Sequence, residues 1–223
     1  MAHVVDKFTR PDRQTIEAFR GLGAATVYEA AGRAGSVDPA IKPLARGIRL
    51  LGPAVTVRCH PRDNLMLHKA LQIAQEGDVI VATTDGYPSA GYWGGLMATS
   101  AMARKLGGLA IDGCVRDSEE ILSMGFPVFC RGTCVRGTAK GTLGTVNLPI
   151  LFGEVLVQAG DLILGDDDGL VVIPRAEIQK VLAASRKRVE AEKQKAAVLA
   201  GGVSSVEFNK LEPVFRSLGL EEE

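Results

Sequence analysis

The sequence has no excess of charge of either sign. Lysine and arginine together number 26, and so do aspartate and glutamate, so the formal net charge of the 223 residues is zero. A surface that binds nucleic acid or an anionic membrane needs a basic excess. No apolar run reaches the roughly 18 residues that a membrane-spanning helix requires. The sequence therefore predicts no nucleic-acid partner and no membrane segment.

Cysteines are few, and their spacing does not fit a zinc site. Only two of the four lie close together in the chain, without a second pair or neighbouring histidines. Reduced thiols of this kind are typical of cytoplasmic proteins. Residues 1–13 have no apolar centre and carry acids, so they do not resemble a signal peptide. We expect a cytoplasmic protein with reduced thiols at Cys59, Cys114, Cys130 and Cys134.

Helical and strand patterns alternate along the chain. Residues 65–75 have the apolar spacing of a helix, and the apolar strand 79–82 follows. The same order returns at 96–106 and 109–111. Residues 166–169 (Asp-Asp-Asp-Gly) lie between two apolar strands and predict a tight hairpin turn. We predict an α/β fold with mixed sheets and flanking helices, and the chain is long enough for one domain with a real core.

The stretch 91–117 holds a glycine-flanked helix. Gly94 and Gly95 precede it, and we expect Gly107 and Gly108 to end it, because glycine tolerates the left-handed cap. The first turn of a helix has N–H groups without acceptors inside the helix, and these can bind an anion. The sequence therefore predicts an anion site at the start of this helix.

An arginine and an aspartate follow the next strand. The carboxylate of Asp117 is suited to a hard divalent cation, and Arg116 can pair with a substrate carboxylate or a developing oxyanion. Open α/β sheets place their sites at strand carboxyl ends, which favours a functional pair. Two alternatives stay open: a surface salt bridge, and an Asp117 side chain that caps the helix 118–122.

Two further segments carry charge. Residues 131–144 are rich in glycine and threonine, and their Arg131, Arg136 and Lys140 can bind an anion or form a solvated loop. From Pro174 a long helix runs to about residue 199, with a charged stretch that is too polar for a core. This helix either presents a solvated face or reaches a neighbouring subunit.

Four motifs in fixed order resemble one family. They are GYWGGLMATSAMAR, LAIDGCVRD, GTLGTVNLPI and VQAGDLILGDDDGLVVIPR. They resemble the class II pyruvate aldolases that act on 4-hydroxy-4-methyl-2-oxoglutarate and 4-carboxy-4-hydroxy-2-oxoadipate, a superfamily that also includes the regulator of ribonuclease E activity. The resemblance implies a swivelling β/β/α-type single domain over residues 1–223. It also implies homotrimers or homohexamers with sites between subunits, where residues 175–223 form an arm on a neighbouring subunit.

The resemblance also assigns roles to residues. It makes Asp117 the ligand of Mg²⁺ or Mn²⁺ and places Arg116 on the pyruvyl oxygens, where it stabilises the enolate. A glutamate of the last helix, Glu192 or alternatively Glu190, reaches the site of the neighbouring subunit. The backbone at the helix start receives the pyruvate carboxylate, so the implied substrate-binding residues are Arg116, Gly94, Gly95, Leu96 and Met97.

One position departs from the family pattern. The pattern has an acid, twenty intervening residues and then Arg-Asp, and here the acid is replaced by Gly95. We expect Gly95→Asp to restore a carboxylate and tighten metal binding. The implied activity is cleavage of a 4-hydroxy-2-oxo diacid to pyruvate and a second keto acid, with decarboxylation of oxaloacetate. The alternatives are a non-catalytic regulator of ribonuclease E type and a divergent keto-acid enzyme.

Overall fold

The computed structural model describes residues 3–222 and is built on an eight-stranded mixed sheet. The strand order is β1-β7-β5-β3-β2-β12-β13, and β9 pairs with the end of β2. The strands of this sheet are β1 (Lys42–Pro43), β2 (Leu50–Arg58), β3 (Val79–Thr83), β5 (Gly108–Asp112), β7 (Val128–Cys130), β9 (Thr145–Val146), β12 (Leu162–Asp166) and β13 (Gly169–Ile173).

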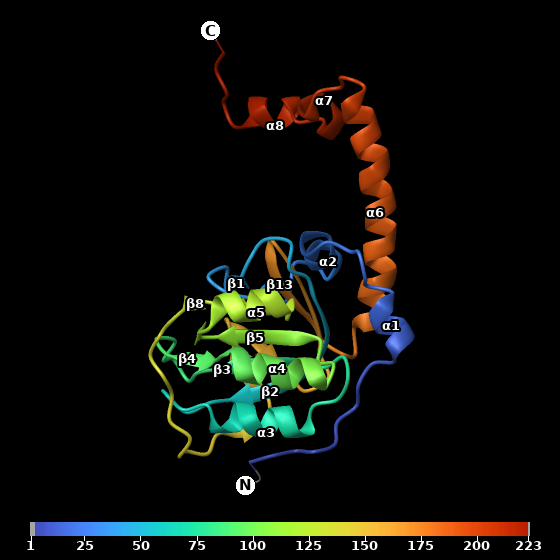
Figure 1. The fold of residues 1–223 in the computed structure, drawn as a ribbon. Helices are drawn as coiled ribbons and strands as arrows, with labels where there is room; N and C mark the ends of the chain where they lie inside the picture. Colours follow the sequence, from blue (N-terminus) through green and yellow to red (C-terminus); the bar gives the residue numbers. More distant parts are fainter. Residues whose placement is uncertain (1–2, 223) are drawn as a thin grey trace.

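The strands β2, β3, β5 and β7 run parallel to one another. The helices between them cover one face of the sheet, namely α3 (Leu65–Ile73), α4 (Gly95–Ala103) and α5 (Ser118–Met124) (Figure 1). Both faces of β3 are buried, as is usual for a parallel strand between two layers. The predicted alternation of helices and strands is confirmed, and it brings the carboxyl ends of β3 and β5 to one edge.

The opposite face of the sheet packs on the hairpin of β10 (Ile150–Phe152) with β11 (Val155–Val157). Elements from both ends of the chain pack on β12 and β13, namely α1 (Arg13–Glu17), α2 (Ala24–Ala30) and the start of α6 (Ile178–Ala200). Phe19, Val27 and Leu182 are buried against β12 and β13. The predicted turn at residues 166–169 is confirmed, because Asp166 pairs with Gly169 at the end of that hairpin. The fold is the expected mixed α/β architecture with a long C-terminal helix.

A second, parallel sheet continues past the edge where β3 and β5 end. It is made of β4 (Gly91–Trp93), β6 (Cys114–Val115) and β8 (Gly132–Thr133). The Trp93 side chain is fully buried and stacks on Phe126, with ring centroids 5.9 Å apart. This small sheet therefore fixes three chain segments side by side, and each of them continues into the candidate site.

Some element boundaries differ from the sequence expectation. The helix α4 ends at Ala103, and the left-handed residue after it is Lys105 (φ 54°), so the expected glycine cap was wrong. Gly108 instead begins β5, where a Cβ would meet the carbonyl oxygen of Pro127 at 2.7 Å. The last long helix begins at Ile178, after a turn that Pro174 opens.

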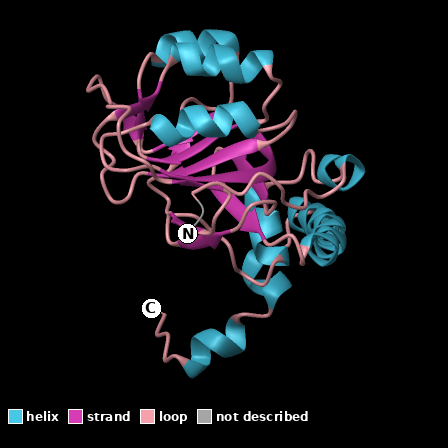
Figure 2. Ribbon diagram, turned by 90° about the horizontal axis from the view of Figure 1, so that it is seen from below, coloured by secondary structure: helices cyan, strands magenta, loops and turns pink. Residues whose placement is uncertain are grey.

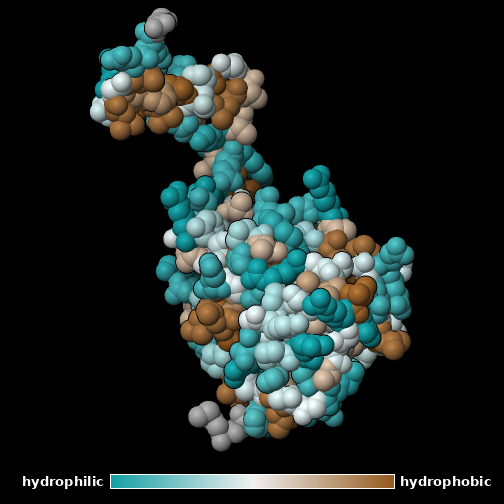
Figure 3. Space-filling model, turned by 90° about the vertical axis from the view of Figure 1, so that its left-hand side faces the viewer, coloured by the Kyte–Doolittle hydropathy of each residue, from teal (hydrophilic) through white to brown (hydrophobic). Residues whose placement is uncertain are grey.

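The end of α6 carries two short helices away from the sheet, α7 (Ser205–Asn209) and α8 (Glu212–Ser217). Neither helix has a buried side chain. Figure 2, a view from below, shows α6 end-on beside the sheet. Figure 3 shows apolar side chains gathered on the outer end of this arm, where Val214, Leu218 and Leu220 are exposed. Within residues 3–222, no helix is both long and apolar enough to cross a membrane.

Candidate active site

Arg116 and Asp117 lie directly after β6. The backbone N–H of Arg116 donates to the carbonyl oxygen of Trp93 in β4 at 2.8 Å, which continues the pairing of the small sheet. Asp117 then has a left-handed backbone, with φ 56° and ψ 40°. That conformation costs a non-glycine residue about 1 kcal/mol, and aspartate is among the residues that accept it. The strained turn directs the Asp117 side chain back toward α4.

The Asp117 carboxylate contacts the first turn of α4. Its Oδ2 accepts a hydrogen bond from the backbone N–H of Gly95 at 3.1 Å. Asp117 occupies the N-cap position of α5, but its side chain makes no capping bond to that helix. The alternative in which Asp117 only caps its own helix is therefore wrong. The carboxylate lies at the positive end of the α4 dipole, where a negative charge is favoured.

The next two backbone N–H groups of the same turn differ in whether they already donate a hydrogen bond. Met97 N–H donates to the carbonyl oxygen of Gly94 at 3.1 Å, whereas Leu96 N–H has no acceptor within residues 3–222. The Leu96 side chain is 86% exposed, so the surface of this turn is open. Leu96 N–H is therefore the better placed of the two for a substrate carboxylate.

A second carboxylate, which the sequence analysis did not single out, reaches the same turn. Glu120 lies on α5, and a Cβ built on Gly95 would overlap its carboxylate group, with Oε1 at 2.7 Å. The space that an acid at position 95 would enter is thus filled from α5. The spacing Asp117-x-x-Glu120 was a readable signal, because residues three apart lie on one face of a helix.

Three glycines leave room for the Arg116 side chain. A Cβ on Gly91 would lie 3.0 Å from the Arg116 Cβ, and one on Gly94 would lie 3.2 Å from Nε. On the loop after β8, a Cβ on Gly137 would lie 3.7 Å from Nη1. Gly94 is tight on its other side as well, since its Cβ would lie 2.5 Å from Asp117 Oδ2. Small residues at these positions hold the guanidinium against the carboxylate, with Arg116 Nε 3.6 Å from Asp117 Oδ2.

The donor set fits a hard divalent cation. Asp117 and Glu120 offer carboxylate oxygens at one helix turn, and the Asp117 side chain is 43% exposed, so water reaches the pair. Across the described residues, no group of three or more His, Cys, Asp or Glu side chains converges. Mg²⁺ commonly binds one or two carboxylates, keeps several water ligands and takes the rest from the substrate. An incomplete protein shell of this kind suits Mg²⁺ or Mn²⁺.

In the basic loop of residues 131–144, one arginine forms ion pairs within the protein and two further basic side chains are exposed to solvent. Arg131 donates to Asp112 and Asp38, so it is not free for a ligand. Arg136 and Lys140 are exposed, and they flank Gly137, which lies beside Arg116.

The buried Asp63 anchors the end of this loop. It accepts the N–H groups of Gly141 and Thr142 at 2.7 and 3.0 Å. Burial raises the pKa of Asp63, but hydrogen bonds from the backbone N–H groups of Gly141, Leu65 and Thr142 outweigh that effect, so the pKa is lowered overall. The anion therefore persists at neutral pH and holds the loop beside the site.

Glu190 and Glu192 lie on α6, which Figure 1 shows on the side of the fold away from β4 and β8. Glu192 pairs with Arg188 at 2.8 Å and accepts a hydrogen bond from the Thr26 hydroxyl at 3.4 Å. A single chain thus brings together residues 94–97, Arg116 and Asp117, but not the glutamates of α6.

The cysteines and His68 show no sign of nucleophilic or metal chemistry. Burial raises the pKa of Cys59 to about 12 and that of Cys130 to about 11, so both thiols stay protonated at neutral pH. All four cysteines are free thiols. Burial on α3, and then the positive charge of Lys140, lower the pKa of His68, which favours a neutral packed imidazole.

Comparison with known proteins agrees with this fold. The family described as RraA-like, Aldolase/RraA, matches residues 3–172. The chain belongs to this family. It is 32% identical over 191 residues to a "Putative 4-hydroxy-4-methyl-2-oxoglutarate aldolase" of Halalkalibacterium halodurans, covering 86% of this chain and 91% of that protein.

Solved structures share the architecture. An uncharacterized protein from Pseudomonas syringae superposes with a TM-score of 0.80 at 26% identity, covering 89% of this chain and 93% of that one. RraAS2 of Streptomyces coelicolor, described as an unusual member of the RNase ES inhibitor RraA protein family, gives a TM-score of 0.77 at 26% identity. That match covers 85% of this chain and 99% of the other. The family thus includes proteins named as aldolases and proteins named as ribonuclease inhibitors.

The packing around Gly94 yields a prediction. Gly94→Ala should displace the Asp117 carboxylate and the Arg116 side chain, because its Cβ would meet both. We expect divalent-metal affinity, measured by isothermal titration, to fall at least about tenfold, as mutations around metal ligands typically cause. Gly141→Ala is the matched control, since nothing lies within 4 Å of its Cβ. Equal metal affinity in the two variants would contradict the proposed geometry.

Proposed function

We propose that this protein is a divalent-metal-dependent carbon–carbon lyase. It would cleave a 4-hydroxy-2-oxo diacid to pyruvate and a second keto acid, and would also decarboxylate oxaloacetate. The observation that supports this most is the convergence of Asp117, Glu120 and Arg116 on the first turn of α4. Two carboxylates, a guanidinium and a free backbone N–H are the groups that binding and cleaving a keto acid requires.

Asp117 and Glu120 would hold Mg²⁺ or Mn²⁺ with the help of water. A bound divalent ion polarises the keto oxygen of an α-keto acid. The position of Glu120 explains how an acid can be absent at position 95 without loss of charge at the site. Asp117 is the N-cap of α5 and Glu120 lies in its first turn, so the two carboxylates would act as one unit.

Arg116 and the start of α4 would position the substrate. The Leu96 N–H would receive the carboxylate of the pyruvyl end, and Arg116 would face the oxygen that becomes negative. In the cleavage step a water molecule takes the proton of the 4-hydroxyl and a carbonyl forms at C4. The bond between C3 and C4 breaks, and the electron pair of that bond forms the pyruvate enolate. Return of the proton from this water to C3 then gives pyruvate. Arg136 and Lys140, exposed on the loop beside Arg116, would attract the distal carboxylate.

The second candidate function is a protein-binding regulator of ribonuclease E type. The likeness to a protein described as an RNase ES inhibitor and the glycine at position 95 favour it. A third candidate is an enzyme of the same fold that acts on another keto acid. Pyruvate release from oxaloacetate and from a hydroxy-oxo diacid, assayed with Mg²⁺ and with chelator, separates the three.

The proposed lyase predicts different defects for the two site residues. Asp117→Asn should abolish metal binding, whereas Arg116→Ala should bind metal and lose about 10²–10³ in turnover, the typical cost of one charge-stabilising donor. Titration of Mg²⁺ and steady-state pyruvate release measure the two effects. Full turnover after exhaustive chelation, or normal rates in both variants, would exclude this mechanism.

The Glu120 carboxylate lies where a side chain at position 95 would lie, so the effect of Gly95→Asp on metal affinity should depend on Glu120. Glu120→Ala should weaken metal binding about 10- to 100-fold. Gly95→Asp alone would bring two carboxylates into one space, but Gly95→Asp in the Glu120→Ala background should restore much of the affinity. Gly95 has no positive φ, so aspartate is compatible with its backbone. Glu119→Ala is the matched control, and failure of the paired change to exceed Glu120→Ala would contradict this role.

We also propose that the arm of residues 175–222 packs on a neighbouring subunit of a homotrimer or homohexamer, where Glu192 acts. Residue 223 of the expected arm lies outside the described residues. The exposed apolar side chains of α7 and α8, and the distance of α6 from the Arg116 edge, support an intersubunit role.

Subunit mixing tests this assembly. Asp117→Asn and Glu192→Gln should each be inactive alone. If the subunits are mixed and exchange, some sites then combine an intact Asp117 with an intact Glu192, and activity should return. Glu190→Gln should remain active on its own and serves as the control. Mixtures that stay inactive although exchange is shown by native mass spectrometry would exclude the intersubunit site.

A further inference from the structure

A cavity of 510 Å³ lies at the opposite edge of the sheet from Arg116. It is bounded by α1, by the beginning of β2, and by Asp78 and Gly107, which lead into β3 and β5. The parallel strands β3 and β5 begin here and end at the Arg116 edge, so this cavity is separate from the candidate active site. Its volume falls within the roughly 300–1,000 Å³ of small-molecule sites.

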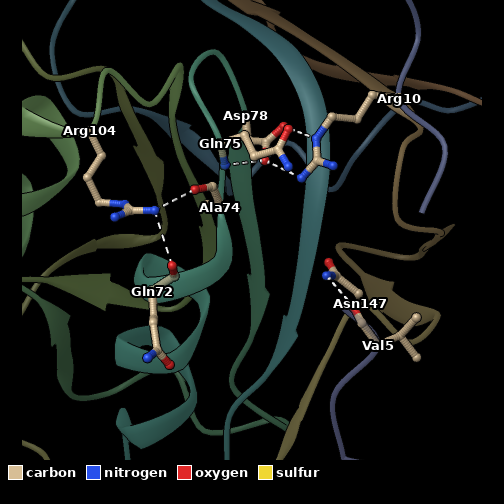
Figure 4. A network of polar contacts seen from close by, with 8 residues as sticks. All are labelled: Val5, Arg10, Gln72, Ala74, Gln75, Asp78, Arg104 and Asn147. Carbon is tan, nitrogen blue, oxygen red and sulfur yellow. Dashed lines mark hydrogen bonds and ion pairs between the residues drawn. The ribbon is translucent and has the colours of Figure 1, made fainter. Parts of the chain in front are cut away.

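The lining of the cavity includes an ion pair between Arg10 and the buried Asp78, and the protein itself provides the hydrogen-bond partners of this carboxylate. Arg10 donates to both carboxylate oxygens of Asp78 at 2.8 and 2.7 Å, and Gln75 N–H donates to the same carboxylate at 2.8 Å (Figure 4). Figure 4 also shows Asn147 donating to the Val5 carbonyl oxygen, at 2.8 Å. These bonds hold the N-terminal segment in place, and they leave no free charge on Asp78 for a ligand.

The walls of the cavity are mainly apolar. Their apolar parts come from α1, from the turn after it, and from the central strands, while charged side chains line the rest of the cavity. A ligand body that fits them must be apolar, because a polar body would lose its water without gaining partners. The apolar lining residues are Ile16, Phe19, Leu22, Leu51, Pro53 and Leu164.

The rim carries positive charge that the protein neutralises only in part. Arg20 is paired with Glu17 at 2.5 Å. Lys105 lies 3.7 Å from Glu76. Arg49 donates to the Leu22 carbonyl oxygen at 3.3 Å and lies 3.9 Å from its nearest carboxylate, on Asp166, and Arg13 has no ion-pair partner among the described residues. Two guanidinium groups beside an apolar wall favour a ligand with one anionic end, since arginine binds carboxylates through paired N–H groups.

We infer that this cavity binds a carboxylate with an apolar body, such as a medium-length acyl chain. The carboxylate would lie between Arg13 and Arg49, and the chain would lie along the wall that Ile16 and Leu51 help to form. The inference does not depend on the proposed lyase activity, because neither Arg116 nor Asp117 lines the cavity.

Titration of the full-length protein with octanoate, in chelator and without substrate, tests the inference. We expect saturable binding, with acetate and the uncharged octanamide each at least about tenfold weaker, because each lacks one of the two recognised parts. Absence of saturable octanoate binding, equal binding of octanamide, or displacement of octanoate by pyruvate would overturn the inference.

Variants locate the site. Arg13→Ala and the double variant Arg13→Ala/Arg49→Ala should weaken octanoate binding progressively, while Arg13→Lys should retain most of it. Arg186→Ala, an exposed arginine on α6, is the matched control. Thermal melting checks that the variants fold. If the double variant does not fold, Arg13→Ala alone still tests the site, because the Arg13 side chain makes no hydrogen bond or ion pair within the described residues. Methyl NMR shifts should concentrate at Ile16, Leu22 and Leu51. Unchanged affinity in Arg13→Ala, or shifts confined to other methyl groups, would overturn the assignment.

Discussion

The hydrogen bond between the Asp117 carboxylate and the Gly95 N–H organises the candidate active site. It joins the end of the β6 segment to the first turn of α4, two elements that the chain forms separately. The left-handed backbone at Asp117 and the absence of a side chain at Gly94 both serve this contact. A larger residue at position 94, or a relaxed backbone at position 117, would separate the carboxylate from the helix start.

The parallel sheet explains why this contact can form. Its strands end at one edge, and the small β4-β6-β8 sheet follows there. This small sheet positions Arg116 beside Gly91 and Gly94. The guanidinium lies among glycines instead of bulky side chains, so it stays half exposed next to a carboxylate. The guanidinium is therefore open to solvent, whereas a close-packed core would exclude water from it.

Much of the fold could be predicted from the sequence. The alternation of helices and strands, the hairpin at residues 166–169 and the start of α4 after Gly94 all follow from local patterns, which act over a few residues. The end of α4 could not be predicted in this way, because Lys105 adopts the left-handed conformation while Gly107 and Gly108 pack closely against other chain segments. The role of Glu120 needed the structure as well, since the neighbourhood of Gly95 and α5 is a tertiary contact. Arg116 and Asp117 could be singled out from the sequence. The acid that occupies the space next to the Gly95 Cα, Glu120, could not.

Asp117 caps a short helix and Glu120 lies in its first turn, and this position would link ligand affinity to local order. Asp117 and Glu120 converge only while the first turn of α5 is formed, and that helix has seven residues with Ile121 as its buried anchor. Short helices open locally at a lower free-energy cost than core strands. A cation held by both side chains would therefore close this turn, and the amide hydrogens of α5 would exchange with solvent more slowly when the site is filled. If the site binds a cation in this way, the packing of Ile121 would contribute to its affinity although Ile121 touches no ligand.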